Sequence, residues 1–167
     1  MSCLSKREIR RLIEEKGLIS DYVDLETQLQ PNGFDCTLRK IGKISGEARI
    51  DFDNTERVLP EVSEIEFRNG WVYLNRGYYR AYINEIVRIP ENLMALARPR
   101  SSLIRAGANV LTAVWDAGYQ GRSEVGIVVY NDSGVWLKKN ARIVQLVFFT
   151  LDSETEGYRG IYRGENM

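Results

Sequence analysis

The sequence predicts an all-β protein, a distorted jelly roll or β-barrel with a short N-terminal helix and one short internal helix. Many short segments alternate apolar and polar residues with period two, turn signals separate them, and few segments have helical periodicity. The chain has 167 residues, of which 44% are apolar, and this size suits one compact domain. We therefore expect a single β domain at residues 1–151 and a flexible C-terminal arm at residues 152–167.

The N-terminal helix is predicted by its two ends and by one apolar face. Ser5-Lys6-Arg7-Glu8 is a capping box, in which the serine and glutamate side chains satisfy free backbone N–H groups. Ile9, Leu12 and Ile13 follow on one helical face, and Gly17 supplies a C-terminal stop. These signals predict a short surface helix that ends before residue 17.

Strands are expected where the period-two alternation is clearest. The segment 71–74 follows an Asn69-Gly70 pair, a dipeptide typical of a tight hairpin turn that would join it to 64–67. The predicted strands are 49–53, 64–67, 71–74, 78–89, 93–97, 109–115, 123–130, 135–138 and 142–150. The internal helix is expected as a short turn that begins at Ser101.

The composition excludes several kinds of chemistry. The chain has no histidine, so Ser-His-Asp and Cys-His catalysis and His-ligated zinc are excluded, and two cysteines cannot complete a zinc site. Cys3 and Cys36 are expected to be free thiols, although a disulfide between them is possible in principle. Lys plus Arg equals Asp plus Glu at 23 each, which indicates no nucleic-acid polymer as partner. No 18-residue apolar run occurs, and we expect a cytoplasmic protein without a membrane segment.

The segment PRSSLIRAG, residues 99–107, offers groups that hold anions. Arg100 and Arg105 carry forked donors, Ser101 and Ser102 carry hydroxyls, and the start of a helical turn exposes backbone N–H groups. Phosphate fits this set of donors. An ordinary capped turn with solvated arginines explains the segment equally well.

Gly126 leaves a gap on one face of the predicted strand 123–130. Val125, Ile127 and Val129 share the other face of that strand. A glycine in a strand interior marks the close approach of a ligand or another backbone, and a β-bulge is the alternative explanation.

Five segments, taken in order, resemble the five motifs of the trimeric deoxyuridine triphosphatases (dUTPases) and the related deoxycytidine triphosphate (dCTP) deaminases, and the helix-first start resembles the archaeal and deaminase branch. The segments are PNGFDCTL (31–38), PRSSLIRAG (99–107), VWDAGYQG (114–121), ARIVQLVF (141–148) and YRGIYRG (158–164). The resemblance spans nearly the whole chain and implies the dUTPase-like (β-clip) form of the jelly roll. It also implies a homotrimer in which the motifs meet across subunit boundaries.

The resemblance implies a role for each motif. Asp116 would orient and deprotonate the water that attacks the α-phosphorus, and Tyr119 would lie against the deoxyribose. Backbone groups of Val110, Leu111 and Thr112 would read the pyrimidine edge. Further expected contacts to the triphosphate are Arg100, Ser101, Ser102, Arg105 and Gln145, with Tyr162 and Arg163 from the C-terminal arm as it closes over the active site; a frayed terminus is the alternative for that arm.

Magnesium is the cofactor that this chemistry implies, because it would neutralise charge on the triphosphate while a carboxylate acts as base. Asp35 would lie near the metal and act through a water molecule, and a turn carboxylate after Gly33 is the alternative.

The expected activity is hydrolysis of dUTP to dUMP and pyrophosphate. The deaminase branch carries a glutamate ten residues after the motif aspartate, and this chain has Gly126 there, while Gln145 matches the triphosphatase pattern. Two departures bear on base recognition: one residue fewer than in the deaminase-like pattern lies between Thr112-Ala113 and Asp116, and Ala117-Gly118 replaces the second acid of the triphosphatase pattern. A dCTP deaminase or bifunctional enzyme, and a non-catalytic nucleotide-binding jelly roll, are the alternatives.

Overall fold

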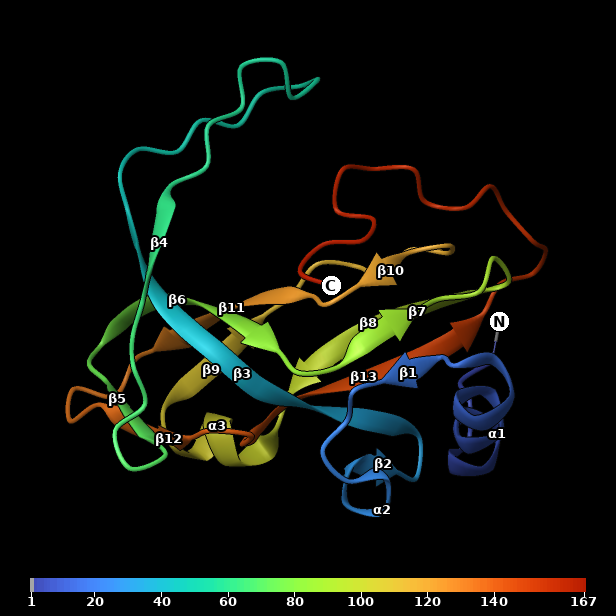
Figure 1. The fold of residues 1–167 in the computed structure, drawn as a ribbon, viewed down its shortest axis with the longest axis horizontal. Helices are drawn as coiled ribbons and strands as arrows, with labels where there is room; N and C mark the ends of the chain where they lie inside the picture. The colour runs from blue at the N-terminus through green and yellow to red at the C-terminus, as the bar shows by residue number, and fades with distance from the viewer. Residues whose placement is uncertain (1) are drawn as a thin grey trace.

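The computed structural model describes residues 2–167 and shows a mostly β molecule (Figure 1). Its helices are α1 (Lys6–Lys16), α2 (Leu25–Gln28) and α3 (Ser101–Arg105). Its strands are β1 (Ile19–Ser20), β2 (Leu29–Gln30), β3 (Gly33–Ser45), β4 (Glu61–Glu64), β5 (Trp71–Leu74), β6 (Gly77–Ile83), β7 (Ile86–Arg88), β8 (Leu93–Pro99), β9 (Ala108–Leu111), β10 (Gln120–Gly121), β11 (Glu124–Val129), β12 (Val135–Lys138) and β13 (Arg142–Thr150).

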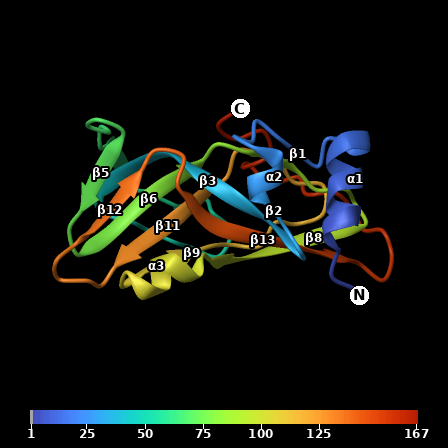
Figure 2. The same ribbon diagram turned by 90° about the horizontal axis from the view of Figure 1, so that it is seen from below.

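The strands form one large and two small antiparallel sheets. The large sheet runs β8-β13-β3-β6-β11-β9, and β2 and β4 pair with β3 outside that path. The small sheets are β1-β7-β10 and β5-β12. The large sheet curves into a nearly closed barrel, with α1 and α2 beside one end (Figure 2). The predicted all-β jelly-roll or barrel class is confirmed.

Helix α1 has the boundaries that the sequence predicts. The Ser5 side chain accepts from the backbone N–H of Glu8, and Gly17 ends the helix with a left-handed φ of 64°. Ile9 and Ile13 are buried against the sheet. A capped helix with one apolar stripe therefore packs on the barrel and leaves its charged face in water.

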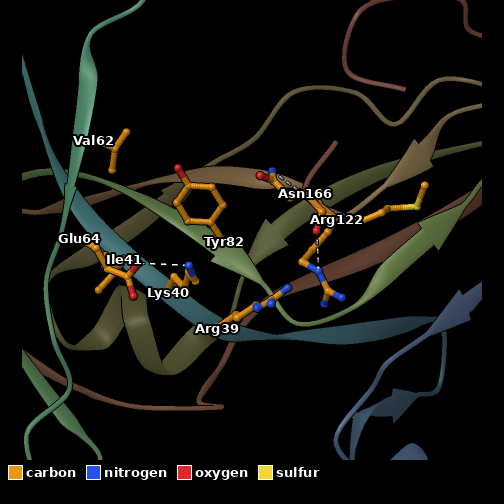
Figure 3. A pocket seen from close by; sticks show the side chains of 9 residues that line it. Arg39, Lys40, Ile41, Val62, Glu64, Tyr82, Arg122 and Asn166 are labelled. Carbon is orange, nitrogen blue, oxygen red and sulfur yellow. Dashed lines mark hydrogen bonds and ion pairs between the residues drawn. The ribbon is translucent and has the colours of Figure 1, made fainter. Parts of the chain in front are cut away.

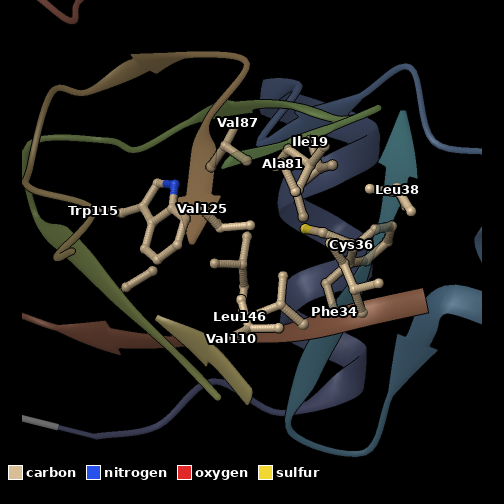
Figure 4. Close-up of a cluster of buried hydrophobic side chains, with 14 of the residues drawn as sticks. Ile19, Phe34, Cys36, Leu38, Ala81, Val87, Val110, Trp115, Val125 and Leu146 are labelled. Atoms are coloured by element: carbon tan, nitrogen blue, oxygen red, sulfur yellow. The ribbon is translucent and has the colours of Figure 1, made fainter. Parts of the chain in front are cut away.

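Strand β3 lies at the centre of the molecule, although the sequence analysis did not predict it. Phe34, Cys36 and Leu38 are fully buried and lie among core side chains from β6, β11 and β13 (Figure 4). Asp35 and Thr37, on the opposite face of the strand, are also buried. Because polar and apolar residues are buried alike, the polarity of this segment does not mark it as a half-exposed strand.

The predicted strand 49–53 is wrong. Residues 46–60 form a hairpin arm that projects from the barrel (Figure 1), and a single isolated bridge pairs Arg49 with Val58. Ile50 is 75% exposed and Phe52 is fully exposed, while Asp53 Oδ1 accepts from the backbone of Thr55 at the tip. The alternation is present in this arm, but no sheet lies behind it to receive the apolar face.

Other boundaries differ by a few residues. The predicted strand 78–89 is divided into β6 and β7, because the chain bends at Asn84, just before the buried Glu85. Strand β4 ends at residue 64, where the prediction placed its start, and β9 ends at residue 111. The Asn69-Gly70 turn is confirmed, with left-handed φ values of 50° and 80°, but the main partner of β5 is β12.

Both cysteines are free, as expected, with Cys3 exposed and Cys36 buried. Within residues 2–167, the structure contains no helix that is both long and apolar enough to cross a membrane.

Candidate active site

Asp116 stands at the start of a tight turn between two paired segments. Trp115 exchanges two backbone hydrogen bonds with Ala95 of β8, of 2.9 and 3.0 Å, and thereby fixes the chain before Asp116. The backbone N–H of Tyr119 donates to the Asp116 carbonyl at 3.1 Å, and Gly118 has a φ of +77° that closes the turn. The side chain of Asp116 is exposed, so the sheet edge presents its carboxylate to solvent.

Asp116 lines a cavity of about 190 Å³ together with Tyr119 and Tyr162, which the sequence analysis also singled out. The remaining lining residues are Ala113, Val114, Trp115, Ser123, Glu124, Tyr158 and Glu165. Three residues of the complete lining belong to the C-terminal segment: Tyr158, Tyr162 and Glu165. The segment 152–167 therefore forms one wall of the cavity that holds Asp116.

Tyr119 lies under the C-terminal segment with its hydroxyl enclosed. Its O–H donates to Glu165 Oε1 at 2.7 Å, and its oxygen lies 2.8 Å from Ser123 Oγ. Burial raises the pKa of Tyr119, and it also raises the pKa of Glu165. At neutral pH Tyr119 is therefore a neutral donor. Its ring meets the Tyr158 ring edge-on, with 6.1 Å between the ring centroids.

Glu124, two residues before Gly126 on β11, lies in the same cavity. Its carboxylate pairs with Arg80 of β6, and it accepts from Asn166 Nδ2 at 3.2 Å. No side chain within residues 2–167 donates to the Asp116 carboxylate, whereas Glu124 and Glu165 both accept hydrogen bonds. Asp116 is thus the acid of this cavity that remains available to a water molecule.

The gap at Gly126 is filled by a neighbouring ring. A Cβ atom at this position would come within 2.7 Å of Tyr78 Oη and 2.8 Å of Tyr78 Cε2. Strand β11 pairs regularly with β6 and β9 at this point, so close approach of a side chain, and not a bulge, accounts for the glycine.

Asp35 lies in a second cluster, at the junction of β3, β8 and β13. It is fully buried, pairs with Arg100 and lies 3.2 Å from the Arg142 guanidinium, while its Oδ1 atom has no hydrogen-bond partner within residues 2–167. Gln145 is the cross-strand neighbour of Asp35. Burial, followed by the charge of Arg142, lowers the pKa of Arg100, which stays a cation at neutral pH.

Helix α3 begins immediately after Arg100. Ser101, Ser102 and Arg105 are exposed on it, and no side chain caps its N-terminus. These hydroxyl and guanidinium groups therefore face solvent, as a site for an anion requires.

Val110, Leu111 and Thr112 line a third region, a groove of about 720 Å³ beside α3. Ile104 and Tyr130 are among the apolar side chains that face this groove, and both are more than half exposed. The groove and the Asp116 cavity share no lining residue within the described part of the chain.

The C-terminal segment is held by main-chain contacts. The backbone N–H of Tyr158 donates to the Ala117 carbonyl at 2.7 Å, and that of Arg122 donates to the Glu165 carbonyl at 2.9 Å. Figure 3 shows the cavity behind this contact, where Asn166 meets Arg122 beside Tyr82 and Arg39. Arg163 is exposed at the far end of the segment.

The structure thus brings some of the predicted residues together and keeps others apart. Asp116, Tyr119 and Tyr162 share one cavity. Asp35, Arg100 and Gln145 share the β3–β13 junction, with Ser101, Ser102 and Arg105 on the adjoining helix, and the base-reading segment 110–112 lines the third region. Glu165 was missed because one acid in the sequence of a C-terminal tail carries no periodic or motif signal.

Comparison with known proteins gives consistent results. A family model described as dCTP deaminase-like matches residues 3–151. The chain is 65% identical over 167 residues to an Archaeoglobus fulgidus protein named "Probable deoxyuridine 5'-triphosphate nucleotidohydrolase", an alignment that covers 100% of this chain and 99% of the relative. It is 42% identical over 141 residues to the "Deoxyuridine 5'-triphosphate nucleotidohydrolase" of Methanocaldococcus jannaschii, with 83% of this chain and 89% of the relative covered.

Among solved structures, the 2'-deoxycytidine 5'-triphosphate deaminase from Agrobacterium tumefaciens superposes with a TM-score of 0.66 at 20% sequence identity. The match covers 87% of this chain and 47% of that chain. At this identity the likeness shows a shared fold.

Proposed function

Because the chain belongs to the dCTP deaminase-like family, we propose that it is a hydrolase that converts dUTP to dUMP and pyrophosphate. The relative from Archaeoglobus fulgidus carries the triphosphatase name and aligns over the whole chain. The observation that carries the proposal within the structure is the free, solvent-facing carboxylate of Asp116 in a cavity with Tyr119.

Asp116 is the proposed catalytic base. Hydrolysis of a phosphoanhydride requires an in-line water, stabilisation of the developing charge and exclusion of bulk solvent, and little covalent help from the protein. An ionised carboxylate without a competing donor can accept the proton of that water. The oxygen of the water then bonds to the α-phosphorus, and pyrophosphate leaves.

The sugar and base are proposed to lie along the same hairpin. Tyr119, which lines the Asp116 cavity, is proposed to lie against the deoxyribose, where a 2'-hydroxyl would collide with it. The backbone of Val110, Leu111 and Thr112 borders an open groove at the outermost strand of the large sheet, and the Val110 N–H there donates to Asn109 Oδ1 at 2.8 Å. Hydrogen bonds from a strand edge identify a base without charged side chains.

The triphosphate is proposed to bind at the guanidinium and hydroxyl groups around α3. Arg100 and Gln145 are half-buried, whereas Ser101, Ser102 and Arg105 are exposed on the helix. Tyr162 and Arg163 reach the phosphates from the C-terminal segment, and charge-assisted bonds of this kind each contribute about 1.5–3 kcal/mol.

Magnesium fits this chain as a companion of the triphosphate. Within residues 2–167 no cluster of three or more His, Cys, Asp or Glu side chains could hold a metal ion. Asp35 Oδ2 faces two guanidiniums that oppose a cation, and Oδ1 is unpartnered but buried, so a metal-bound water would reach Oδ1 only after a local rearrangement. The ion would be held mainly by phosphate oxygens and water, and would neutralise triphosphate charge.

A homotrimer is proposed because one chain does not assemble these groups. The Asp116 cavity and the Arg100 cluster lie on different parts of the barrel, and the groove between α3 and β9 exposes apolar side chains. A cyclic arrangement of three copies would bring the hairpin of one subunit to the phosphate-binding groups of the next, and repeat that contact three times.

Deamination of dCTP is the competing activity because the family model bears that name. A deaminase requires a proton-transferring group within hydrogen-bond reach of the pyrimidine C4 position. The strand position where the deaminase branch carries glutamate is Gly126 here, and the neutral ring of Tyr78 covers it. The hydrolase is therefore the favoured activity.

The decisive assay incubates the protein with each deoxynucleoside triphosphate and magnesium, and measures pyrophosphate and ammonia separately. Pyrophosphate from dUTP without ammonia from dCTP supports the proposal. Ammonia release would establish deamination, and tight nucleotide binding without either product would indicate a non-catalytic protein. Chelation of magnesium should abolish pyrophosphate release, because the triphosphate charge is then no longer neutralised.

A further inference from the structure

A chain of buried hydrogen bonds runs from Trp115 to the C-terminal segment. Trp115 Nε1 donates to Ser123 Oγ at 2.7 Å, Ser123 Oγ lies 2.8 Å from the Tyr119 hydroxyl oxygen, and Tyr119 donates to Glu165 Oε1 at 2.7 Å. Trp115, Ser123 and Tyr119 are each less than 10% exposed. Buried hydrogen-bond chains of this kind polarise one another and hold their members rigidly.

The Glu165 carboxylate, at the end of this series of hydrogen bonds, sets the direction in which each proton points. Tyr119 donates to Glu165 Oε1, so the Tyr119 proton points to Glu165. The Tyr119 oxygen is then free to accept from Ser123, and Ser123 in turn accepts from the Trp115 indole N–H, which can only donate. Every donor is therefore satisfied in one arrangement, and loss of Glu165 would leave the other hydroxyls free to reorient.

Asp116 lies between Trp115 and Tyr119, two residues that this series of hydrogen bonds connects through Ser123. Trp115 precedes it directly, and Tyr119 forms the other end of its turn through the 3.1 Å bond to the Asp116 carbonyl. A shift of either ring would move the Asp116 backbone. Glu165 makes the side-chain hydrogen bond that joins the C-terminal segment to Tyr119 and, through Ser123, to Trp115, while the Tyr158 ring packs edge-on against Tyr119.

We propose that Glu165 is a positioning residue, which couples docking of the C-terminal segment to the orientation of Asp116 through Tyr119, Ser123 and Trp115. The inference rests on the proposed function of Asp116 and adds a residue to that site. Docking of the segment then does more than cover the site, because it also orders the turn that holds the base.

The first measurement is a steady-state comparison of Glu165→Ala with the wild-type protein on dUTP. A misoriented base slows the chemical step, so kcat should fall about tenfold while KM changes by less than about twofold. Glu165→Gln keeps an acceptor for Tyr119 and should restore most of the lost kcat. Glu156→Ala removes an exposed acid from the same segment and is the matched control, with kcat expected at the wild-type value.

Ser123→Ala interrupts the middle of the chain while the main-chain contacts of the segment remain. It should reproduce the kcat loss of Glu165→Ala. If Ser123→Ala retains full kcat, or if Glu165→Ala raises KM alone, Glu165 acts only as a clamp on substrate and the positioning role is wrong.

A spectroscopic readout separates this inference from the proposed activity. Trp71 is 42% and Trp136 is 61% exposed, so a Trp71→Phe/Trp136→Phe background leaves the buried Trp115 as the tryptophan reporter. In that background, Glu165→Ala should shift the Trp115 emission to longer wavelength, and Glu156→Ala should not. Unchanged emission overturns the coupling. A shift in a protein that does not hydrolyse dUTP would preserve the coupling and reject the function.

Discussion

Asp116 and its acidic neighbours differ in what binds them. Glu124 is neutralised by Arg80, and Glu165 accepts from Tyr119, whereas no side chain of the described residues donates to Asp116. Asp116 therefore has both carboxylate oxygens open to a water molecule, whereas Glu124 and Glu165 already use theirs in an ion pair or a hydrogen bond to the protein. The one at position 116 is the acid that the structure leaves free.

Asp116→Asn should preserve nucleotide binding and lower turnover by about 10²- to 10⁴-fold, because the amide keeps the shape of the side chain but cannot accept the proton. Single-turnover hydrolysis of dUTP and the affinity for a non-hydrolysable analogue measure the two effects separately. Turnover within a factor of about two of the wild-type value would remove Asp116 from the proposed mechanism.

Glu85 provides a pH-dependent test of stability. It is fully buried, and its carboxylate accepts from Gln28 Nε2 and from the backbone and hydroxyl of Thr37. Burial raises the pKa of Glu85 above its ordinary value of 4.5, against the opposing effect of these hydrogen bonds. A raised folded-state pKa contributes stability below pH 4.5 that is lost as pH rises through the raised value.

Glu85→Gln cannot titrate at this position. The free energy of unfolding of the wild-type protein minus that of the variant should therefore be larger at pH 4.5 than at pH 7. Denaturant unfolding at both pH values measures the difference. A constant difference would show that ionisation of Glu85 costs the fold nothing.

At the scale of elements, the C-terminal segment meets the Asp116 turn backbone to backbone. A Cβ atom on Gly118 would come within 2.5 Å of Gly157 Cα and 2.8 Å of the Tyr158 nitrogen. The contact therefore depends on the absence of a side chain at position 118. A segment with no helix or strand of its own is held in place by this approach and by main-chain hydrogen bonds.

Gly118→Ala should displace the segment, since overpacking of this kind costs about 1–3 kcal/mol and lowers the docked fraction at least about fivefold. Limited trypsin digestion after Arg159 and Arg163 measures that fraction. Gly46→Ala is the matched control, because Gly46 also has a positive φ, of 97°, but a Cβ there meets nothing within 4 Å. Equal digestion of both variants would contradict the docking.

The sequence predicted elements where burial follows polarity and missed those where it does not. Strands 135–138 and 142–150 alternate on a half-buried sheet, so their pattern was sufficient. Strand β3 was missed because Asp35 and Thr37 are buried with partners from distant segments, Arg100 and Glu85, that no local pattern shows. The segment 49–53 has the alternation of a strand without a partner sheet.

The same contrast holds for the candidate site. Asp116, Tyr119 and Tyr162 belong to motifs, and the structure places them in one cavity. Glu124 and Glu165 line that cavity as well, but their positions depend on pairing with Arg80 and on the path of the C-terminal segment. Local sequence carries motifs, whereas these two residues are placed by tertiary contacts.

At the scale of the whole molecule, the proposed site is divided among regions that one chain keeps apart. The hairpin with Asp116 and the cluster around Arg100 would belong to different subunits of each site in the proposed homotrimer. A division of this kind can be tested with two inactive variants, because a mixed trimer can contain sites in which both halves are intact.

Asp116→Asn and Arg100→Ala, unfolded together and refolded as a mixture, should recover roughly a quarter of the wild-type activity, since half of the hairpins and half of the phosphate-binding clusters are intact. The activity of dUTP hydrolysis measures this recovery. Asp116→Asn mixed with Tyr119→Ala is the control, because both changes lie on one hairpin and no hairpin in that mixture is intact. Absence of recovery in the first mixture would place each site within a single subunit.

The path of the C-terminal segment has a consequence for solubility. Strand β10 is the outermost strand of its sheet, and the segment covers its free edge, where Gly164 donates to the Gln120 carbonyl at 2.6 Å and Glu165 forms a parallel bridge with Gly121. Uncovered strand edges recruit other chains and promote aggregation. We therefore expect the last residues, about ten of them, also to protect the folded protein from self-association. For this reason single substitutions test the catalytic role proposed for this segment more cleanly than truncation does.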